Sequence, residues 1–246
     1  MGLSGLSGLS GLSSLAGSDY SSRVFGIAPT NLVAYWRLNE QVGTTGTGSV
    51  LDYSGNGKTG TPTNITFGSS GIGDGLTAAG FNGTSSYINV WSASLASAIN
   101  ASEFTLMGWL SNSNWSANCR MIQFVSSGID LFQFTNPGVA GLMRFTYTAG
   151  GTALAVDSTG NSGTTFLHFA MTVSKSNNRF RGFKNGSQIG ADVTGLGIWG
   201  GTWPTNTTLL GAANVTPALV LSGLLQHIAL WNTELTPAQV LQMATV

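Results

Sequence analysis

Groups able to perform acid–base chemistry are few in this chain of 246 residues, and they lie far apart in the sequence. Retaining hydrolysis of a glycosidic bond requires two carboxylates about 5 Å apart, which a Glu-x-Asp type of spacing on one strand would supply. The nine acidic residues are instead at least twelve positions apart: Asp19, Glu40, Asp52, Asp74, Glu103, Asp130, Asp157, Asp192 and Glu234. The acidic residues therefore give no indication of a hydrolase.

The histidines and serines also lack a catalytic setting. His168 and His227 each lie inside an apolar segment, FLHFAM and LLQHIAL, where we expect a packed or half-exposed structural imidazole. The serines of GSS and SGN belong to turn-forming segments and not to a nucleophile motif. The glycine-rich segments lack the Lys-Ser/Thr pair and the helix that follow a phosphate-binding loop. These patterns predict that the protein is not an enzyme.

Tryptophans are better candidates for binding. Trp199 and Trp203 lie in the segment LGIWGGTWP, between glycines and a proline, and Trp91 and Trp115 lie near the ends of strand-like segments. An exposed indole combines an apolar face with a polar edge, so these rings could stack against sugars. The alternative is that they cover one end of the fold or form contacts between subunits.

Four of the nine basic residues fall close together, at Lys175, Arg179, Arg181 and Lys184. Arg179 and Arg181 are two positions apart, so both side chains lie on one face of a strand. Such a patch could contact acidic glycans or a partner protein. The alternative is the solvated side of a hairpin that the Asn185-Gly186 pair closes.

The composition restricts the class of partner. Charged residues make up 7% of the chain, against about 25% in typical soluble domains, and the nine basic and nine acidic residues cancel. No net field favours nucleic acid or an anionic membrane, and no apolar segment approaches the roughly 20 residues of a membrane span. The start lacks a signal-peptide pattern, and the single cysteine, Cys119, excludes an intrachain disulfide. A surface of Ser, Thr, Asn and Gly is typical of β-rich extracellular or virion-surface proteins.

Short strand-like segments separated by turn residues follow Asn31. The segment LVAYWRLN alternates, which places Leu32, Ala34, Trp36 and Leu38 on one face. Asn-Gly pairs supply the positive φ angles of tight turns, and they occur at 56–57, 82–83 and 185–186. Eight or more strands with no helix between them predict an all-β fold, an antiparallel jelly-roll β-sandwich.

One short helix is expected, at the C-terminus. The segment TPAQVLQM offers Thr236 as N-cap, Pro237 as the first helical residue and Gln239 for a capping box. We expect this helix to pack on the sandwich through its apolar side chains.

Several segments between about Leu32 and Met243 resemble, in their order, the concanavalin A-like, laminin-G-like and pentraxin-like jelly rolls. The most specific are DYSGNGKTG, FNGTSSYINV and GLLQHIALWNTELTPAQV. The resemblance implies a lectin-like sandwich with Trp36, Trp109 and Trp231 packed in its core. It implies a fold and no single activity, because the same jelly roll also hosts glycoside hydrolases.

Departures from the family pattern bear on metal binding. Many members carry acidic residues after the Phe-Asn-Gly turn and on the last strand, where this chain has Ser85-Ser86 and Gln226-His227. Calcium takes six to eight oxygen ligands, usually with several carboxylates, so we expect no cofactor. Asp52 and Glu40 are weak candidates for a calcium site. Their alternative roles are the stabilisation of a turn and a solvated strand end.

A Gly-Leu-Ser triplet is repeated four times between Gly2 and Ser13. Glycine at every third position is the spacing of collagen, although this segment has no proline. An extended chain with this period carries one apolar ridge, made of Leu3, Leu6, Leu9 and Leu12. The ridge could dock on another protein or bundle with two sister chains; the alternative is a flexible linker. The chain therefore divides into a repeat anchor with linker, residues 1–29, and a jelly-roll domain, residues 30–246.

Gly-x-x repeats ahead of a lectin-like domain are similar to head-fibre, capsid-decoration and tail-fibre proteins of bacteriophages. The resemblance implies a non-enzymatic protein of the virion surface, held on capsid or tail proteins by its extended N-terminal arm as a homotrimer. Its jelly roll would bind host or mucus glycans. The alternatives are a tail-fibre adhesin and a free extracellular carbohydrate-binding module of bacterial origin. Neither nucleic acid nor a membrane is expected as a partner.

Overall fold

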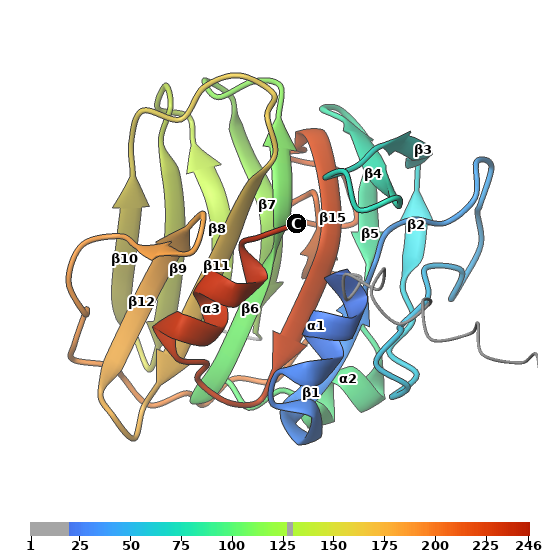
Figure 1. The fold of residues 1–246 in the computed structure, drawn as a ribbon. Helices are drawn as coiled ribbons and strands as arrows, with labels where there is room; N and C mark the ends of the chain where they lie inside the picture. The colour runs from blue at the N-terminus through green and yellow to red at the C-terminus, as the bar shows by residue number, and fades with distance from the viewer. Residues whose placement is uncertain (1–19, 127–129) are drawn as a thin grey trace, which may run out of the picture.

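Two antiparallel β-sheets packed face to face make up most of the chain in the computed structural model, which describes residues 20–126 and 130–246 (Figure 1). The first sheet has the order β13-β12-β11-β6-β15-β4-β3, and β1 also pairs with β15. Its strands are β1 (Leu32–Trp36), β3 (Thr66–Ser70), β4 (Thr77–Asn82), β6 (Glu103–Asn112), β11 (Leu167–Ser174), β12 (Arg179–Lys184), β13 (Ser187–Gln188) and β15 (Ser222–Trp231).

The second sheet has the order β10-β9-β8-β7-β14-β5-β2. Its strands are β2 (Thr61–Thr63), β5 (Tyr87–Asn89), β7 (Asn118–Val125), β8 (Leu131–Pro137), β9 (Met143–Ala149), β10 (Thr152–Ser158) and β14 (Thr208–Leu210). The helices are α1 (Tyr20–Gly26), a 3-10 turn (Pro29–Asn31), α2 (Ala93–Ala98) and α3 (Pro237–Met243). This architecture confirms the predicted antiparallel jelly-roll sandwich.

The space between the sheets is filled by side chains that alternate along each strand. On β11, Phe169 and Met171 point into this inner core, whereas Ala170 points to the outer face, the face of the first sheet that is turned away from the second. Aromatic rings join the two sheets, with the centroids of Phe134 and Phe169 4.4 Å apart. The burial of apolar area between the sheets is the main stabilising contribution.

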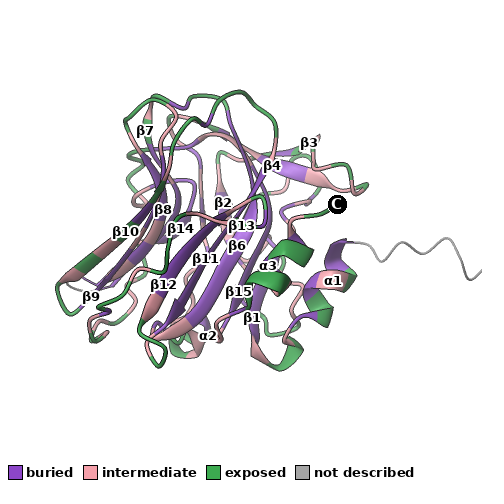
Figure 2. Cartoon of the chain, turned by 60° about the vertical axis from the view of Figure 1, so that its left-hand side comes forward, coloured by how far each residue is buried: buried purple, intermediate pink, exposed green. Residues whose placement is uncertain are grey.

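A second apolar cluster, the outer cluster, covers the outer face of the first sheet. Helices α1 and α3 lie next to each other over this face (Figures 1 and 2). Tyr20 of α1 packs edge-on against Trp109, which is buried with Trp231 beneath the helices. The predicted burial of Trp36, Trp109 and Trp231 is therefore confirmed, although only Trp36 lies in the inner core.

Residues 20–29 belong to this folded unit. Tyr20, Val24 and Ile27 are at most 4% exposed, and the Trp231 indole donates a 2.9 Å hydrogen bond to the carbonyl of Ile27. The expected linker over residues 20–29 is corrected accordingly, because residues 20–26 form α1, whose Tyr20 and Val24 share a buried face at i, i+4, and the buried Ile27 directly follows the helix. None of the helices that the structure describes has the length and apolar composition of a membrane span.

Helix caps explain where the short helices begin. As predicted, Thr236 Oγ1 accepts the Gln239 N–H and the Gln239 side chain accepts the Thr236 N–H at 2.8 Å, which completes a capping box at α3. Helix α2 was not predicted, although Ser92 caps it by accepting the Leu95 N–H at 3.0 Å.

Strand β1 departs from strict alternation. Its register with β15 shifts between Leu32 and Ala34, so Leu32 joins the outer cluster while Ala34 and Trp36 face the inner core. The prediction that all the alternate residues share one face is wrong for Leu32, because an irregularity in the ladder reverses the side to which a residue points.

Candidate functional site

A groove on the outer face of the first sheet is the candidate site, and strand register explains its floor. Leu225 of β15 and Leu110 of β6 point into the inner core, so their neighbours Leu224 and Ser111 point outward. Leu224 pairs with Gly80 on one side and with Ser111 on the other. Because Gly80 has no side chain and Ser111 has a short one, no large side chain stands above the sheet on either side of Leu224.

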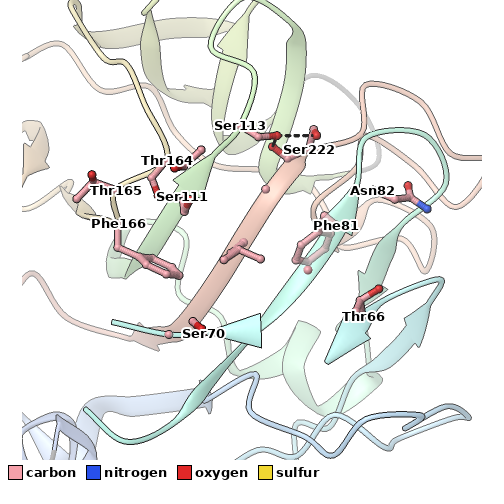
Figure 3. Close-up of a pocket in the computed structure, with 14 residues that line it drawn as sticks. Thr66, Ser70, Phe81, Asn82, Ser111, Ser113, Thr164, Thr165, Phe166 and Ser222 are labelled. Atoms are coloured by element: carbon pink, nitrogen blue, oxygen red, sulfur yellow. Dashed lines mark hydrogen bonds between the residues drawn. The ribbon is translucent and has the colours of Figure 1, made fainter. Parts of the chain in front are cut away.

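Two walls border this floor (Figure 3). Thr164, Thr165 and Phe166, which lead into β11, lie on one side, and Thr66 of β3 and Asn82 of β4 lie on the other. The groove has a volume of about 570 Å³, within the range of small-molecule sites. The groove begins next to helix α1. The Tyr20 ring of α1 contacts Trp109 of β6, and the next outward-pointing residue along β6 is Ser111, which lines the groove.

The groove offers hydroxyl groups around an apolar floor. Ser111 Oγ donates to the carbonyl of Thr164 at 2.6 Å, and the hydroxyls of Ser113 and Ser222 are 2.7 Å apart. None of the 14 lining residues, all within the described ranges, is acidic or basic. The groove therefore suits a neutral, polar ligand with an apolar face, and its lining holds no carboxylate for glycoside hydrolysis.

A second, smaller hollow lies against the other side of Phe166. It has a volume of about 180 Å³ and shares Thr165 and Phe166 with the groove. The rest of its lining includes Asn161, Lys184 and Asn185, of which Lys184 carries the only charge. Phe166 is thus an aromatic partition between a neutral groove and a hollow with one cation.

The structure brings three of the four candidate tryptophans together at the end of the sandwich. The rings of Trp199 and Trp203 lie 4.8 Å apart, and the Trp91 indole donates to the carbonyl of Trp203 at 2.9 Å. Trp199 and Trp203 are half-buried and contact Phe132 of the inner core. Trp115 is 8% exposed and packs within the inner core, so its ring offers no free face to a sugar.

Arg179 and Arg181 share one face of β12, as expected, and both are ion-paired. Arg179 Nη2 lies 2.7 Å from Glu234 Oε2, and Arg181 Nε lies 2.7 Å from Asp192 Oδ1. Arg181 also reaches Glu234, at 3.3 Å. An acidic glycan at this patch would have to compete with the carboxylates of the chain itself.

The weak calcium candidates have structural roles. Asp52 accepts the backbone N–H groups of Tyr35 and Lys58 at 2.9 and 2.8 Å, which confirms its alternative role in a turn. Glu40 is 8% exposed instead of solvated; it accepts the Leu51 N–H at 3.0 Å, and burial raises the pKa of its carboxyl group. Within the described ranges, no cluster of three or more His, Cys, Asp or Glu residues could hold a metal ion.

Both histidines are buried, which is the packed one of the two structural positions expected for them. His227 Nε2 lies 2.7 Å from Asp74 Oδ2, and its Nδ1 lies 2.6 Å from the Tyr35 hydroxyl. Burial alone would raise the pKa of Asp74, but the hydrogen bond and charge of His227, together with hydrogen bonds from the Leu76 N–H and Gln226, outweigh it, so the pKa of Asp74 is lowered. Neither ring nitrogen of His168 has a hydrogen-bond partner in the described chain, and burial lowers the pKa of His168 to about 3.

Sequence reasoning missed Phe166, Leu224 and the groove that they line. The alternation of β15 and of the segment before β11 shows which side chains share a strand face. It does not show that Gly80, Leu224 and Ser111 lie side by side, because strand pairing brings together residues more than 100 positions apart.

Comparison with known proteins identifies the fold. Residues 82–241 match the Laminin_G_3 family, described as the concanavalin A-like lectin/glucanases superfamily. Comparison with curated protein sequences gives no significant match.

Solved structures of similar fold include domain 4 of AbnA, a GH43 extracellular arabinanase from Geobacillus stearothermophilus, in complex with arabinotriose. It is 18% identical with a TM-score of 0.62, over 87% of this chain and 98% of that domain. The binding domain of botulinum neurotoxin serotype D is 9% identical with a TM-score of 0.64, over 88% of this chain. The chain spans 52% of that toxin domain. At these identities the likeness concerns the fold alone.

Proposed function

Because the chain belongs to the concanavalin A-like lectin/glucanases superfamily, we propose that it is a carbohydrate-binding protein and that the outer-face groove is its sugar site. The observation that carries the proposal is the lining of the groove, an apolar floor at Leu224 and an aromatic wall at Phe166 within a rim of Ser and Thr hydroxyls. A sugar ring has an apolar C–H face and hydroxyl groups around its edge. Leu224 and Phe166 can therefore contact the C–H face of the sugar, and the Ser and Thr hydroxyls can form hydrogen bonds with the sugar hydroxyls.

The proposed activity is binding without hydrolysis. The groove lining lacks the pair of carboxylates that glycoside hydrolysis uses. The similar arabinanase domain, solved in complex with arabinotriose, supports a short oligosaccharide as the class of ligand.

The test is a glycan-array screen of the full chain, followed by titration of the best ligand against Phe166→Ala and Trp199→Ala. We expect Phe166→Ala to weaken binding at least tenfold, because Phe166 lines the groove, and to lower the unfolding temperature as well, because the ring also packs on the outer cluster. Trp199→Ala should keep binding and lower the unfolding temperature, because its ring packs on the inner core. If only Trp199→Ala loses binding, the site lies at the tryptophan end. If no glycan binds the wild-type chain, the proposed function is wrong.

We further propose that the Gly-Leu-Ser repeat attaches this domain to a virion, so that sugars are bound at the particle surface. The repeat sequence supports this role; Leu3, Leu6, Leu9 and Leu12 lie outside the described residues. Replacing the four leucines with serine should abolish incorporation into particles without changing the unfolding of the domain. Retained incorporation would show that the leucines are not the anchor, whereas absence of the wild-type chain from particles would favour the alternative, a free extracellular carbohydrate-binding module.

A further inference from the structure

Lys184 differs from the other basic residues in having no partner. All nine basic residues lie within the described ranges. The side chains of the other eight contact a carboxylate, a hydroxyl, an amide or carbonyl oxygen, or an aromatic ring of the chain. The ammonium group of Lys184 makes no hydrogen bond or ion pair with a described residue, although the residue is half-buried in the lining of the smaller hollow.

The hairpin that carries Lys184 is fixed beside Phe166. Lys184 is the last residue of β12, and Asn185 follows it in the turn. Asn185 Oδ1 accepts the backbone N–H of His168 at 2.9 Å, and the Asn185 N–H donates to the carbonyl of His168 at 2.8 Å. His168 is two residues from Phe166, so these bonds fix the backbone at Lys184 next to the backbone at Phe166.

Asn161 gives the hollow a fixed wall. It is 5% exposed, and its Nδ2 donates to the carbonyls of Gly141 and Ser158 at 2.8 and 2.9 Å, which fixes the orientation of the amide. Its Oδ1 has no partner among the described residues and is buried within the chain. Asn161 therefore shapes the hollow, and the ammonium group of Lys184 is the charged group in its lining that a ligand would contact.

We propose that the hollow binds the anionic group of an acidic sugar, with Lys184 as its counter-ion. This inference deepens the proposed glycan-binding function and rests on it. A neutral sugar unit would occupy the groove, and the adjoining unit, bearing a carboxylate or a sulfate, would lie on the Lys184 side of Phe166. Neither lining holds an acidic residue that would repel that charge.

The test measures the binding of the full chain to a disaccharide of one neutral sugar and one uronic acid, and to its methyl ester, in which a neutral ester replaces the carboxylate. At low ionic strength we expect the acid to bind about five to ten times more tightly, and added salt to reduce the difference. Lys184→Gln should remove the preference and leave binding of the ester unchanged. Lys175→Gln is the matched control, because Lys175 lies at the other end of the β11–β12 hairpin and donates to the carbonyl of Leu196. A sulfated neutral oligosaccharide and its unsulfated parent form a second pair that identifies the preferred anion.

The outcomes separate the two proposals. Equal binding of the charged and uncharged member of both pairs, with both weakened by Phe166→Ala, would refute the anionic subsite and leave the groove in place. A preference for acid that survives Lys184→Gln would also refute it. Failure of the wild-type chain to bind any of these sugars or any glycan of the array would refute the carbohydrate function itself.

Discussion

At the scale of single residues, His168 shows how burial without a partner affects stability. Its ring lies 5.3 Å from that of Trp109 on the outer face, and the residue is fully buried. Protonation would place a charge in this apolar setting without a counter-ion, so burial lowers the pKa of His168 to about 3. The folded chain therefore keeps a neutral imidazole at a pH where the unfolded chain binds a proton.

This difference predicts that the protein loses stability in mild acid. Because the pKa of His168 is lower in the folded than in the unfolded chain, its contribution is complete above about pH 6.5 and is lost as pH falls toward 3. The loss is about 1.4 kcal/mol per pH unit, or about 2 kcal/mol between pH 6.5 and pH 5. Urea unfolding of wild type and His168→Phe at pH 7.5 and pH 5 measures it. We expect the variant to lose about 2 kcal/mol less than wild type over this interval; an equal loss in both proteins would contradict the assignment.

Residues whose roles depend on their near neighbours in sequence could be predicted. The capping box of Thr236 and Gln239 and the turn at Asp52 follow from spacings of a few residues, and the structure contains both. Phe166 could not be found in this way, and Lys184 could be assigned only to a basic cluster. Their importance depends on which hairpin turn is fixed beside which strand, and on the ammonium group of Lys184 having no partner among the described residues.

At the scale of secondary-structure elements, the strands and the capped C-terminal helix α3 could be predicted from the sequence, whereas α1 and α2 could not. Alternation over five or more residues is a strong signal in a strand, whereas α1 has only seven residues and no side-chain cap that sequence reasoning recognised. Its signal was the apolar spacing of Tyr20, Val24 and Ile27. The packing of these residues on Trp109 and Trp231 stabilises the helix, since an isolated helix this short is unstable in water.

The packing of α1 predicts that two truncations behave differently. A chain that begins at Tyr20 retains the outer cluster and should unfold at nearly the same temperature as the full chain. A chain that begins at Leu32 loses three buried side chains, each contributing about 1.5–3 kcal/mol, and exposes Trp109 and Trp231. Thermal unfolding monitored by near-ultraviolet circular dichroism should show a loss of well over 10 °C for the shorter chain. Equal unfolding temperatures would show that α1 does not stabilise the domain.

At the scale of the whole molecule, the sandwich could be predicted from the sequence, but the outer face could not. Turn signals and alternating strands predict two stacked sheets, yet they do not say which part of a sheet the helices cover. In the structure α1 and α3 cover those outward residues of β6 and β15 that belong to the outer cluster (Figure 1). The groove lies farther along the same two strands (Figure 3). The same face therefore carries both the start of the described chain and the proposed sugar site.

A trimer formed through the Gly-Leu-Ser repeat would strengthen binding to a surface that carries many glycans. If the Gly-Leu-Ser repeat bundles three chains, three grooves are tethered together, and binding to a multivalent glycan surface strengthens without any new contact. Mass photometry of the full chain should then show a species of three 25.4 kDa chains, and a chain that begins at Tyr20 should be monomeric. A full-length variant with Leu3, Leu6, Leu9 and Leu12 replaced by serine is the matched control, because it keeps the glycines and the length. If the wild-type chain is also monomeric, self-association through the repeat is wrong, and avidity would have to come from attachment to a particle.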